Sequence, residues 1–434
     1  MLASWIPLLL AVSIQSAEDL PRYQLRSGLK LFTESEGEGT SQGSKSTTSG
    51  TTEITILQKC PDGAFWVLMR GRVRIDFGAD FQIPEQQRWA WFRLWPDGAY
   101  EPNESTDQLS IESASFPRLP NDPTDLEKGW TSPVPGRSRT VRYEIDDSES
   151  GDWTLRATAS GPLMKVFEQE SKATLRFDRE RGLIAESTLE FSQGEGIRSR
   201  DVSRSRLVKT EQCSAEELTS MVASFDRFLE ARVEARQMIR GSEDDDRYDR
   251  ARSLLEGTRD TLTHPGIRAL VEHTISEVRQ ESRRAKELHE EFGELIGRAA
   301  ADWKALDLRG RPHSAEESLG SVVVLDFWYR RCGWCIQAMP QVIEIAEHFQ
   351  DRDVRIFGMN TDPVLEDALY VEELFESPIV HLRASDWVEP FHVKSFPTLL
   401  VIDKKGRLRD VHIGYTTDLA EDVIATIERL LQED

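Results

Sequence analysis

An apolar run that ends just before a pair of cysteines constrains the fold of this chain more than any other feature. Residues 322–328 read Val-Val-Val-Leu-Asp-Phe-Trp, and a run of this kind is typical of a strand buried on both faces of a sheet. Residues 339–349 then carry apolar side chains at helical spacing. The pattern predicts an α/β unit in which the sequence Cys-Gly-Trp-Cys, from Cys332 to Cys335, lies at a strand-to-helix turn.

This position is suited to a reactive thiol. A free thiol has a pKa of about 8.5, and a helix N-terminus with nearby positive charge lowers it by about one to several units. Arg330 and Arg331 can contribute to that positive potential. The thiolate is the species that attacks a disulfide, so Cys332 is the candidate nucleophile. Cys335, one helical turn further, is placed to resolve the mixed disulfide.

The remaining cysteines leave two alternatives open. The chain has four cysteines, and the two outside the pair are Cys60 and Cys213. A zinc site usually needs Cys or His ligands in paired spacing, and the sequence has no second C-x-x-C and no closely spaced pair of histidines. We therefore expect redox chemistry and no metal site. Cys60 and Cys213 either close the N-terminal region as a structural disulfide or remain separate thiols, because spacing does not reveal pairing geometry.

Several separated features carry a resemblance to a known fold. The segment from Val324 to Cys335, VLDFWYRRCGWC, looks like the active-site segment of thioredoxins. A strand–turn pair at 305–311, the helix proline Pro340 and the sequence Ser-Phe-Pro-Thr at 395–398 occur in the order found in that fold. This frame resembles the TlpA/ResA family of exported thioredoxin-like proteins. The resemblance covers about a third of the chain and implies an α/β thioredoxin-like domain over residues 297–434.

The resemblance also implies roles for individual residues. Pro397 would follow a cis peptide bond and face the cysteine pair, and cis bonds cost little before proline. The backbone of Phe396 would pair with an extended substrate peptide, with Trp334 and Thr398 as further substrate-binding residues. Asp326 matches the buried acid beneath the cysteines of thioredoxins. It either shuttles the proton of Cys335 or is a structural acid with a buried partner.

The function implied is that of an exported thiol–disulfide oxidoreductase acting on protein substrates. It would reduce or isomerise disulfides more often than introduce them, with electrons from an upstream thiol reductase and no cofactor beyond the Cys332–Cys335 disulfide. One alternative is an envelope or ligand-binding protein whose thioredoxin-like domain is secondary. Another is a thiol peroxidase, but peroxidases of this fold place a threonine shortly before the attacking cysteine, where this chain has Trp-Tyr-Arg-Arg at 328–331.

The N-terminus and the overall charge bear on location and partners. Residues 1–17 contain a short apolar run followed by small residues, which is typical of a secretory signal peptide. A buried N-terminal segment or an uncleaved membrane anchor is the alternative. No later run is long enough to span a membrane, so we expect a periplasmic or otherwise extracytoplasmic protein. The net charge of −22 argues against nucleic acid as a partner.

The first two thirds of the chain divide by pattern into a β-rich part and a helical part. Residues 18–212 contain several short strands broken by turns, which predicts an antiparallel meander or a half-barrel of unknown function. Within it, 33–52 is either a flexible loop or a very polar hairpin, and the aromatic run 89–95 either fills a core or lines a ligand cleft. Residues 213–296 predict a helical connector that packs on the β-rich part, acts as a spacer or forms a dimer surface.

Overall fold

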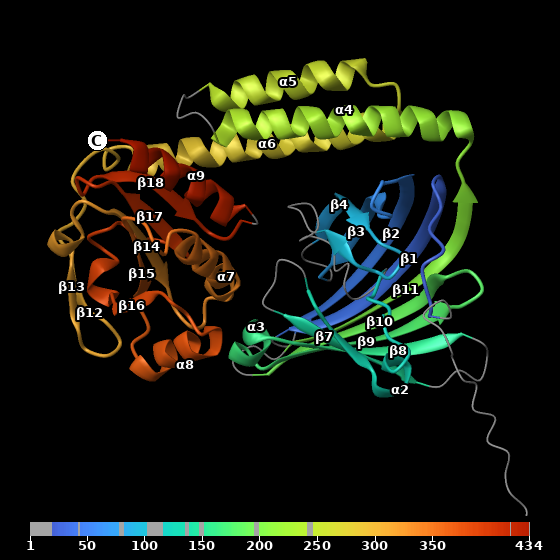
Figure 1. Cartoon of the computed structure of the whole chain (residues 1–434), viewed down its shortest axis with the longest axis horizontal. Helices are drawn as coiled ribbons and strands as arrows, with labels where there is room; N and C mark the ends of the chain where they lie inside the picture. The colour runs from blue at the N-terminus through green and yellow to red at the C-terminus, as the bar shows by residue number, and fades with distance from the viewer. Residues whose placement is uncertain are drawn as a thin grey trace, which may run out of the picture.

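The computed structural model describes residues 20–41, 44–77, 82–101, 116–134, 139–146, 152–194, 199–240, 246–416 and 418–433. The expected signal peptide, residues 1–17, lies outside this part of the chain. Within it, no helix is both long enough and apolar enough to cross a membrane. Figure 1 shows three parts: a curved sheet on the right, a smaller α/β unit on the left, and helices along the top.

The curved part is an 11-stranded sheet in which every neighbouring pair is antiparallel. Its strands are β1 (Leu29–Ser41), β2 (Ser44–Lys59), β3 (Phe65–Asp76), β4 (Gln82–Leu94), β5 (Tyr100–Glu101), β6 (Trp130–Pro133), β7 (Thr140–Asp146), β8 (Trp153–Ser160), β9 (Gln169–Asp178), β10 (Leu183–Gln193) and β11 (Ser199–Gln212). Their order is β5-β4-β3-β2-β1-β11-β10-β9-β8-β7-β6. Consecutive strands are neighbours within β1–β5 and within β6–β11, β5 and β6 are the two edge strands, and β1 meets β11 in the middle. The predicted antiparallel meander is therefore confirmed.

Two open questions about this sheet are resolved. Residues 33–41 and 44–52 lie in the paired strands β1 and β2, so for these residues the polar hairpin is correct and the flexible loop is not. In the aromatic run, Trp89, Trp91 and Phe92 are each at most 4% exposed, which confirms that they fill a core. Because side chains alternate between the faces of a strand, Phe92 points to one face of the sheet, and the two tryptophans point to the other.

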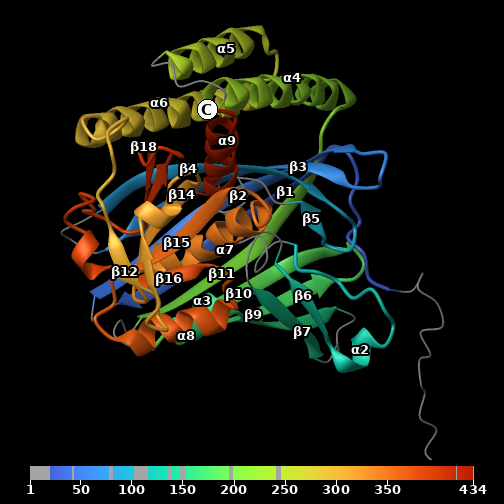
Figure 2. The ribbon, with the colours of Figure 1, turned by 60° about the vertical axis from the view of Figure 1, so that its left-hand side comes forward.

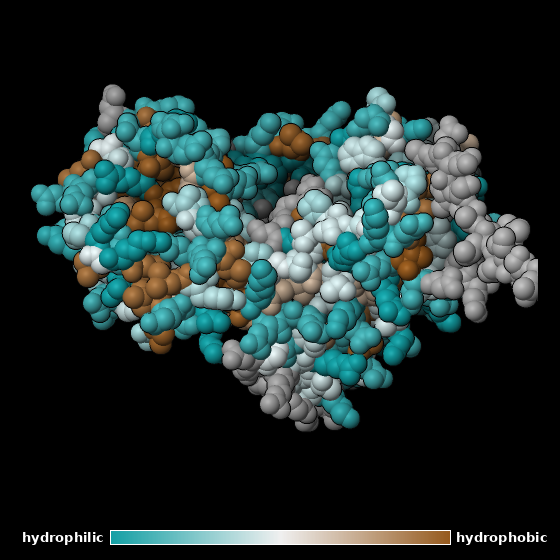
Figure 3. Space-filling view, turned by 60° about the horizontal axis from the view of Figure 1, so that its bottom comes forward, coloured by the Kyte–Doolittle hydropathy of each residue, from teal (hydrophilic) through white to brown (hydrophobic). Residues whose placement is uncertain are grey.

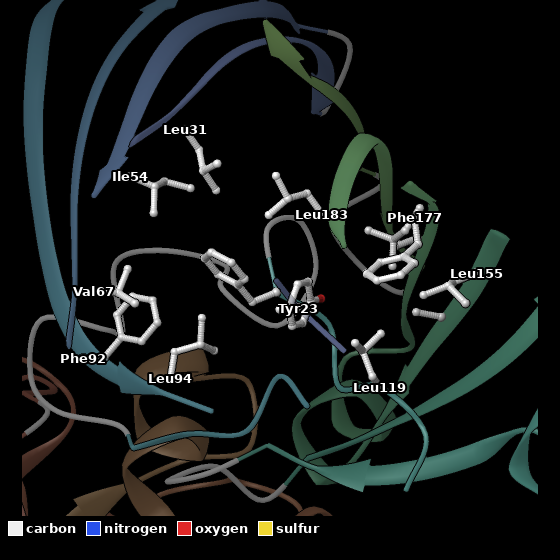
Figure 4. Close-up of a cluster of buried hydrophobic side chains, with 14 of the residues drawn as sticks. Tyr23, Leu31, Ile54, Val67, Phe92, Leu94, Leu119, Leu155, Phe177 and Leu183 are labelled. Carbon is white, nitrogen blue, oxygen red and sulfur yellow. The ribbon is translucent and has the colours of Figure 1, made fainter. Parts of the chain in front are cut away.

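The concave side of the sheet is filled by apolar side chains. Leu31, Ile54, Val67, Phe92 and Leu94 face Leu155, Phe177 and Leu183 across it, with Tyr23 and Leu119 between them (Figure 4). The hydroxyl of Tyr23 donates a hydrogen bond to the Pro117 carbonyl at 2.9 Å, so the polar end of this buried ring is satisfied. The segments before β1 and before β6 thus complete the core of the sheet.

The opposite face of the sheet is covered by a helical layer made of α4 (Ala215–Arg240), α5 (Arg247–Thr261) and α6 (Pro265–Phe292), in which α5 packs on α4 and α6. At the start of α4, the Ser214 hydroxyl accepts the Glu217 N–H at 3.1 Å, as expected for an N-cap. Leu57, Leu68, Trp89 and Trp91 of the sheet share one buried cluster with side chains of these helices. The helical part therefore packs on the β-rich part rather than serving only as a spacer.

The C-terminal unit is an α/β domain with a five-stranded sheet in the order β16-β15-β14-β17-β18. Its elements are β12 (Lys304–Leu306), β13 (Pro312–Ser314), β14 (Val322–Trp328), α7 (Gly333–His348), β15 (Val354–Asn360), α8 (Leu365–Phe375), β16 (Val380–Arg383), β17 (Thr398–Ile402), β18 (Leu408–Ile413) and α9 (Leu419–Gln432). Strands β14, β15 and β16 are parallel, whereas β17 and β18 run antiparallel to their neighbours. Figure 2 shows α7 and α8 near the curved sheet.

Charged side chains link the helical layer to this domain. Arg240 of α4 donates hydrogen bonds to Asp422 at 2.7 Å, Glu421 at 2.6 Å and Asp418 at 3.1 Å, at the start of α9. Phe292, the last residue of α6, is 1% exposed and belongs to the core of the C-terminal domain. The two halves of the chain are thus joined by both polar and apolar contacts.

Replacing Arg240 by methionine is expected to lower the free energy of unfolding by about 1–3 kcal/mol, because three carboxylates lose their shared cation. Urea denaturation followed by tryptophan fluorescence measures this change. Lys172→Ala removes an exposed ion pair with Glu170 and serves as the control, for which no change is expected. If Arg240→Met changed the free energy of unfolding as little as Lys172→Ala does, the structural role of Arg240 would be contradicted.

Candidate active site at the N-terminus of helix α7

The cysteine pair lies where the central strand of the C-terminal sheet passes into a helix. All seven residues of β14 are buried, as the apolar run predicts. Cys332 is the N-cap of α7, and its sulfur accepts the backbone N–H of Cys335 at 3.1 Å. The two cysteines form a disulfide with a Cα–Cα distance of 5.2 Å. The sequence therefore correctly places both sulfurs at the N-terminus of a helix.

Exposure differs sharply among the four residues of the Cys-Gly-Trp-Cys turn. Cys332 is 6% exposed and Cys335 is 1% exposed, whereas the Trp334 side chain between them is 60% exposed. Trp334 stacks on Tyr415, with a ring-centroid distance of 5.8 Å and an interplanar angle of 15°. The exposed indole is available for contact with another protein, as expected for a substrate-binding residue.

The segment before β17 carries the predicted proline. The peptide bond between Phe396 and Pro397 is cis, as expected from the resemblance. The Phe396 ring packs against the cluster that contains both cysteines and lies edge-on to Tyr329 at 5.1 Å. Among the described residues, the backbone N–H and C=O of Phe396 have no hydrogen-bond partner. These groups are therefore available to an extended peptide.

Thr398 requires a correction. Its side chain is 0% exposed, and its hydroxyl donates a hydrogen bond to the Ser395 carbonyl at 2.7 Å. Thr398 also pairs with Phe327 of β14 as the first residue of β17. A buried hydroxyl that is already bonded within the chain cannot contact a substrate, so Thr398 shapes the turn before β17 instead.

Asp326 is a buried acid on the strand that leads to the cysteines. Its neighbours on the same face of β14 are Val324, which clusters with α7 and α9, and Trp328, which clusters with Cys332 and Cys335. Asp326 thus lies under the first turns of α7. It is 3% exposed, and burial raises its pKa to about 7. A carboxyl with this pKa can exchange a proton near neutral pH.

A tryptophan–histidine pair behind the disulfide could not be identified from the sequence. The indole N–H of Trp328 donates to Nδ1 of His381 at 3.2 Å, and Nε2 of His381 lies 3.0 Å from the Ser377 hydroxyl. Burial lowers the pKa of His381 to about 4, so the ring is neutral at neutral pH and can accept this bond. Trp328 is 0% exposed, which confirms that it packs beside the site. The histidine holds its ring in place.

The two arginines before Cys332 differ from expectation. The guanidinium of Arg330 forms an ion pair with Asp367 of α8 and lies over the Tyr370 ring at 4.6 Å. Its charge is therefore compensated locally rather than directed at the sulfur. Arg331 is exposed. The N-terminus of α7 supplies positive potential of its own at Cys332.

Cys60 and Cys213 do not form the disulfide that was one of two alternatives; both are free thiols. Cys60 follows β2 and Cys213 follows β11, and β1 lies between these strands. Two strand spacings are about 10 Å, beyond the roughly 7 Å Cα distance that a disulfide can span. Burial raises the pKa of the Cys213 thiol, which makes it a poor nucleophile.

The described residues contain no group of three or more His, Cys, Asp or Glu side chains arranged to hold a metal ion. Cavities of about 560 and 640 Å³ lie in the curved sheet, and neither is lined by residues of the C-terminal domain. The chemistry that the structure brings together is therefore that of two sulfurs, a buried carboxyl and an open backbone edge.

Comparison with known proteins places this constellation in a family. The AhpC/TSA family matches residues 296–411. The thiol-disulfide oxidoreductase ResA of Geobacillus thermodenitrificans (strain NG80-2) is 31% identical over 140 residues, which cover 31% of this chain and 78% of the relative. The thioredoxin-like protein YneN of Bacillus subtilis (strain 168) is 26% identical over 132 residues, covering 29% of this chain and 76% of the relative.

Among solved structures, the thioredoxin domain of a thiol-disulfide oxidoreductase from Bacteroides vulgatus is 25% identical. That match covers 32% of this chain and 98% of the solved chain, with a TM-score of 0.29. The ResA match spans most of its relative and carries the assignment. Through its C-terminal thioredoxin-like domain, this chain belongs to the ResA family of thiol–disulfide oxidoreductases.

Proposed function

We propose that this protein is exported and reduces or isomerises disulfides in other proteins through Cys332 and Cys335. The observation that carries the proposal is the Cys332–Cys335 disulfide at the N-terminus of α7, with Asp326 beneath it and the open backbone of Phe396 beside it. A disulfide that only stabilised the fold would not need a buried acid beneath it and an open backbone edge beside it.

The proposed reaction begins from the reduced pair. The Cys332 thiolate attacks one sulfur of a substrate disulfide, forms a mixed disulfide and releases the other substrate sulfur as a thiolate. The Cys335 thiolate then attacks the Cys332 sulfur, closes the Cys332–Cys335 disulfide and releases the second substrate thiolate. Two electrons pass from the protein to the substrate. An upstream thiol reductase, acting by the same exchange in reverse, restores the two thiols.

Asp326 supports the second step in this proposal. Cys335 is 1% exposed, so bulk water has little access to its thiol. The carboxylate form of Asp326 accepts the proton of Cys335 as its sulfur attacks, and its pKa of about 7 leaves this form well populated at neutral pH. The proton returns to solvent or to the released thiolate.

The surface of the C-terminal domain supports a protein substrate. Among the residues that the structure describes, five of the nine large apolar side chains that are well exposed lie in this domain: Leu306, Leu319, Trp334, Val364 and Val380. Figure 3, a view from below, shows apolar patches on the left-hand lobe amid hydrophilic residues. Exposed apolar residues of this kind are suited to transient contact with another polypeptide.

Export rests on the signal-like composition of residues 1–17. An oxidising compartment outside the cytoplasm is also where protein disulfides form and persist as substrates. Fractionation of cells that express the full chain tests this part of the proposal. We expect the protein outside the cytoplasm, and we expect mass spectrometry to show that residues 1–17 have been removed.

A Cys335→Ala variant is expected to trap substrates, because the mixed disulfide on Cys332 can no longer be resolved. Non-reducing electrophoresis of the variant, expressed in its own compartment, should show high-molecular-weight species that disappear on reduction. Mass spectrometry identifies the partner and the linked cysteine. Cys332→Ala, which retains Cys335 at 1% exposure, is the matched control and should trap far less. Equal trapping by both variants would contradict the assigned order of attack.

Peroxide reduction by the same fold has less support, because residues 328–331 before Cys332 contain no threonine. Hydrogen peroxide consumption by the reduced protein distinguishes the two activities. We expect this rate to be no greater than that of an ordinary exposed thiol.

A further inference from the structure

The connection between strands β8 and β9 of the curved sheet has an unusual composition. Residues 161–168 read Gly-Pro-Leu-Met-Lys-Val-Phe-Glu and contain the short helix α3 (Pro162–Val166). Connections between antiparallel neighbours are usually about 2–5 residues long, and surface loops are usually polar. We call this stretch the cap segment. Its apolar side chains indicate that something covers it.

The cover is the active site of the C-terminal domain. Val166 is 6% exposed and belongs to the same buried cluster as Cys332 and Cys335, and Phe167 packs against that cluster. Helix α3 contacts both α7 and α8, and it lies beside α8 in Figures 1 and 2. A residue far away in the sequence therefore belongs to the buried cluster that surrounds the sulfur assigned the attack.

The exposures at the tip of α7 differ between neighbouring residues. Trp334, which projects from the turn between the cysteines, is 60% exposed, so the tip of the helix itself reaches solvent. Cys332, which precedes it, is only 6% exposed and shares a buried cluster with Val166. In the proposed reaction, the Cys332 sulfur must approach a sulfur of the substrate disulfide. A sulfur that is buried to this extent leaves a protein disulfide little room for that approach.

The cap segment is held by the curved sheet. Glu168, two residues beyond α3, lies in the left-handed backbone region with φ of 47°, and its carbonyl accepts the N–H of Gly194, just beyond β10, at 3.2 Å. The next residue, Gln169, pairs with Gln193 as the start of β9. The segment is thus attached to one domain and packs on the other.

We propose that Val166 and Phe167 control which substrates reach Cys332. This inference rests on the proposed function and deepens it. The cap segment blocks folded proteins with compact surfaces. It yields to an extended polypeptide that carries an apolar residue beside its cysteine, because such a residue replaces Val166 against the apolar cluster while the peptide pairs with Phe396. The N-terminal sheet is then part of the substrate selection of the enzyme.

Val166→Asp is expected to increase the rate at which iodoacetamide alkylates Cys332 in the reduced full-length protein by about tenfold or more, because the charged side chain no longer packs on the cluster. Peptide mass spectrometry measures alkylation at Cys332 itself. Val208→Asp places the same charge at a valine of the sheet that is 49% exposed, and should leave the rate unchanged. Phe167→Ala, a milder change, should act in the same direction as Val166→Asp with a smaller effect.

Far-UV circular dichroism establishes that the variants keep their secondary structure. Unchanged alkylation of Cys332 in a folded Val166→Asp or Phe167→Ala protein overturns the inference. Faster alkylation together with an equal increase in the reduction of insulin supports both the gating and the proposed function. Faster alkylation without any reduction of insulin, in the variants and in the unmodified chain alike, supports the gating and refutes the proposed function.

Discussion

Replacing Cys332 by serine is expected to lower the rate of insulin reduction, with dithiothreitol as the electron donor, by at least about 100-fold, to the rate of dithiothreitol alone. A serine hydroxyl is not ionised near neutral pH and does not attack a disulfide sulfur, so the first step is lost. The remaining thiol, Cys335, is 1% exposed and cannot substitute for it. The precipitation of insulin chains, followed by turbidity, measures the rate.

Cys60→Ser is the matched control, because it exchanges the same atoms at a free thiol outside the site. Its activity should equal that of the unmodified protein. If the two serine variants and the unmodified protein reduced insulin at the same rate, Cys332 would not be the nucleophile. Equal inactivity of all three proteins with several reductants would remove the enzymatic assignment altogether.

Asp326→Asn is expected to stabilise the C-terminal domain at pH 8 by up to about 4 kcal/mol. Burial raises the pKa of Asp326 from its ordinary value of 3.8 to about 7, so the folded protein favours the neutral form. The unfolded chain ionises this carboxyl above about pH 4. The folded state therefore loses stability as the pH rises from about 4 to about 7, and the loss is constant above that. Asparagine, which stays neutral, removes this dependence.

Urea denaturation of the oxidised proteins between pH 4 and 9 measures the free energy of unfolding. Asp410→Asn is the matched control, and its expected change in this free energy has the opposite sign. Burial alone would raise the pKa of Asp410, but the charge of His412, whose Nε2 lies 3.3 Å from an Asp410 oxygen, and the hydrogen bonds from Val411 and Thr426 outweigh it and lower the pKa to about 2. Its stabilising contribution is present above about pH 4 and is lost as the pH falls. Asp410→Asn should therefore destabilise the domain at neutral pH by about 2 kcal/mol. A destabilising Asp326→Asn at pH 8 would mean that the carboxylate has a partner in the folded protein.

The parts of the site that the sequence predicts are those set by local pattern. A fully apolar run becomes the buried strand β14, the following periodicity becomes α7, and Cys332 consequently lies at a helix N-terminus. Asp326 can be assigned to the α7 face of β14 because strand residues alternate. The cis bond before Pro397 follows from resemblance to thioredoxins rather than from any local rule.

Features that depend on long-range packing could not be predicted in this way. Nothing in the sequence near Val166 indicates that it joins the cluster around the cysteines, because this packing depends on how the curved sheet meets the C-terminal domain. The separation of Cys60 from Cys213 follows from the order of strands, in which β1 lies between them, and spacing along the chain does not encode that order. Thr398 was expected to bind substrate by analogy, yet it is buried as the first residue of β17, which pairs with β14.

Helix α5 lies within the predicted helical connector, but its own apolar pattern is short. Tyr248, Ala251 and Leu255 have the spacing of one helical face, and Ala251 and Leu255 are buried against α4 and α6. The acidic run at residues 243–246 concealed this short pattern. Counting the period on both sides of the run would have revealed the helix.

A single-turnover reaction between the reduced full-length protein and insulin tests the central claim most directly. Acid quenching and alkylation, followed by mass spectrometry, count the Cys332–Cys335 disulfides that form and the insulin disulfides that disappear. We predict equal numbers of the two, with Cys60 and Cys213 remaining thiols. Loss of insulin disulfides without formation of the Cys332–Cys335 bond, or no loss beyond that seen with Cys332→Ser, would contradict the account.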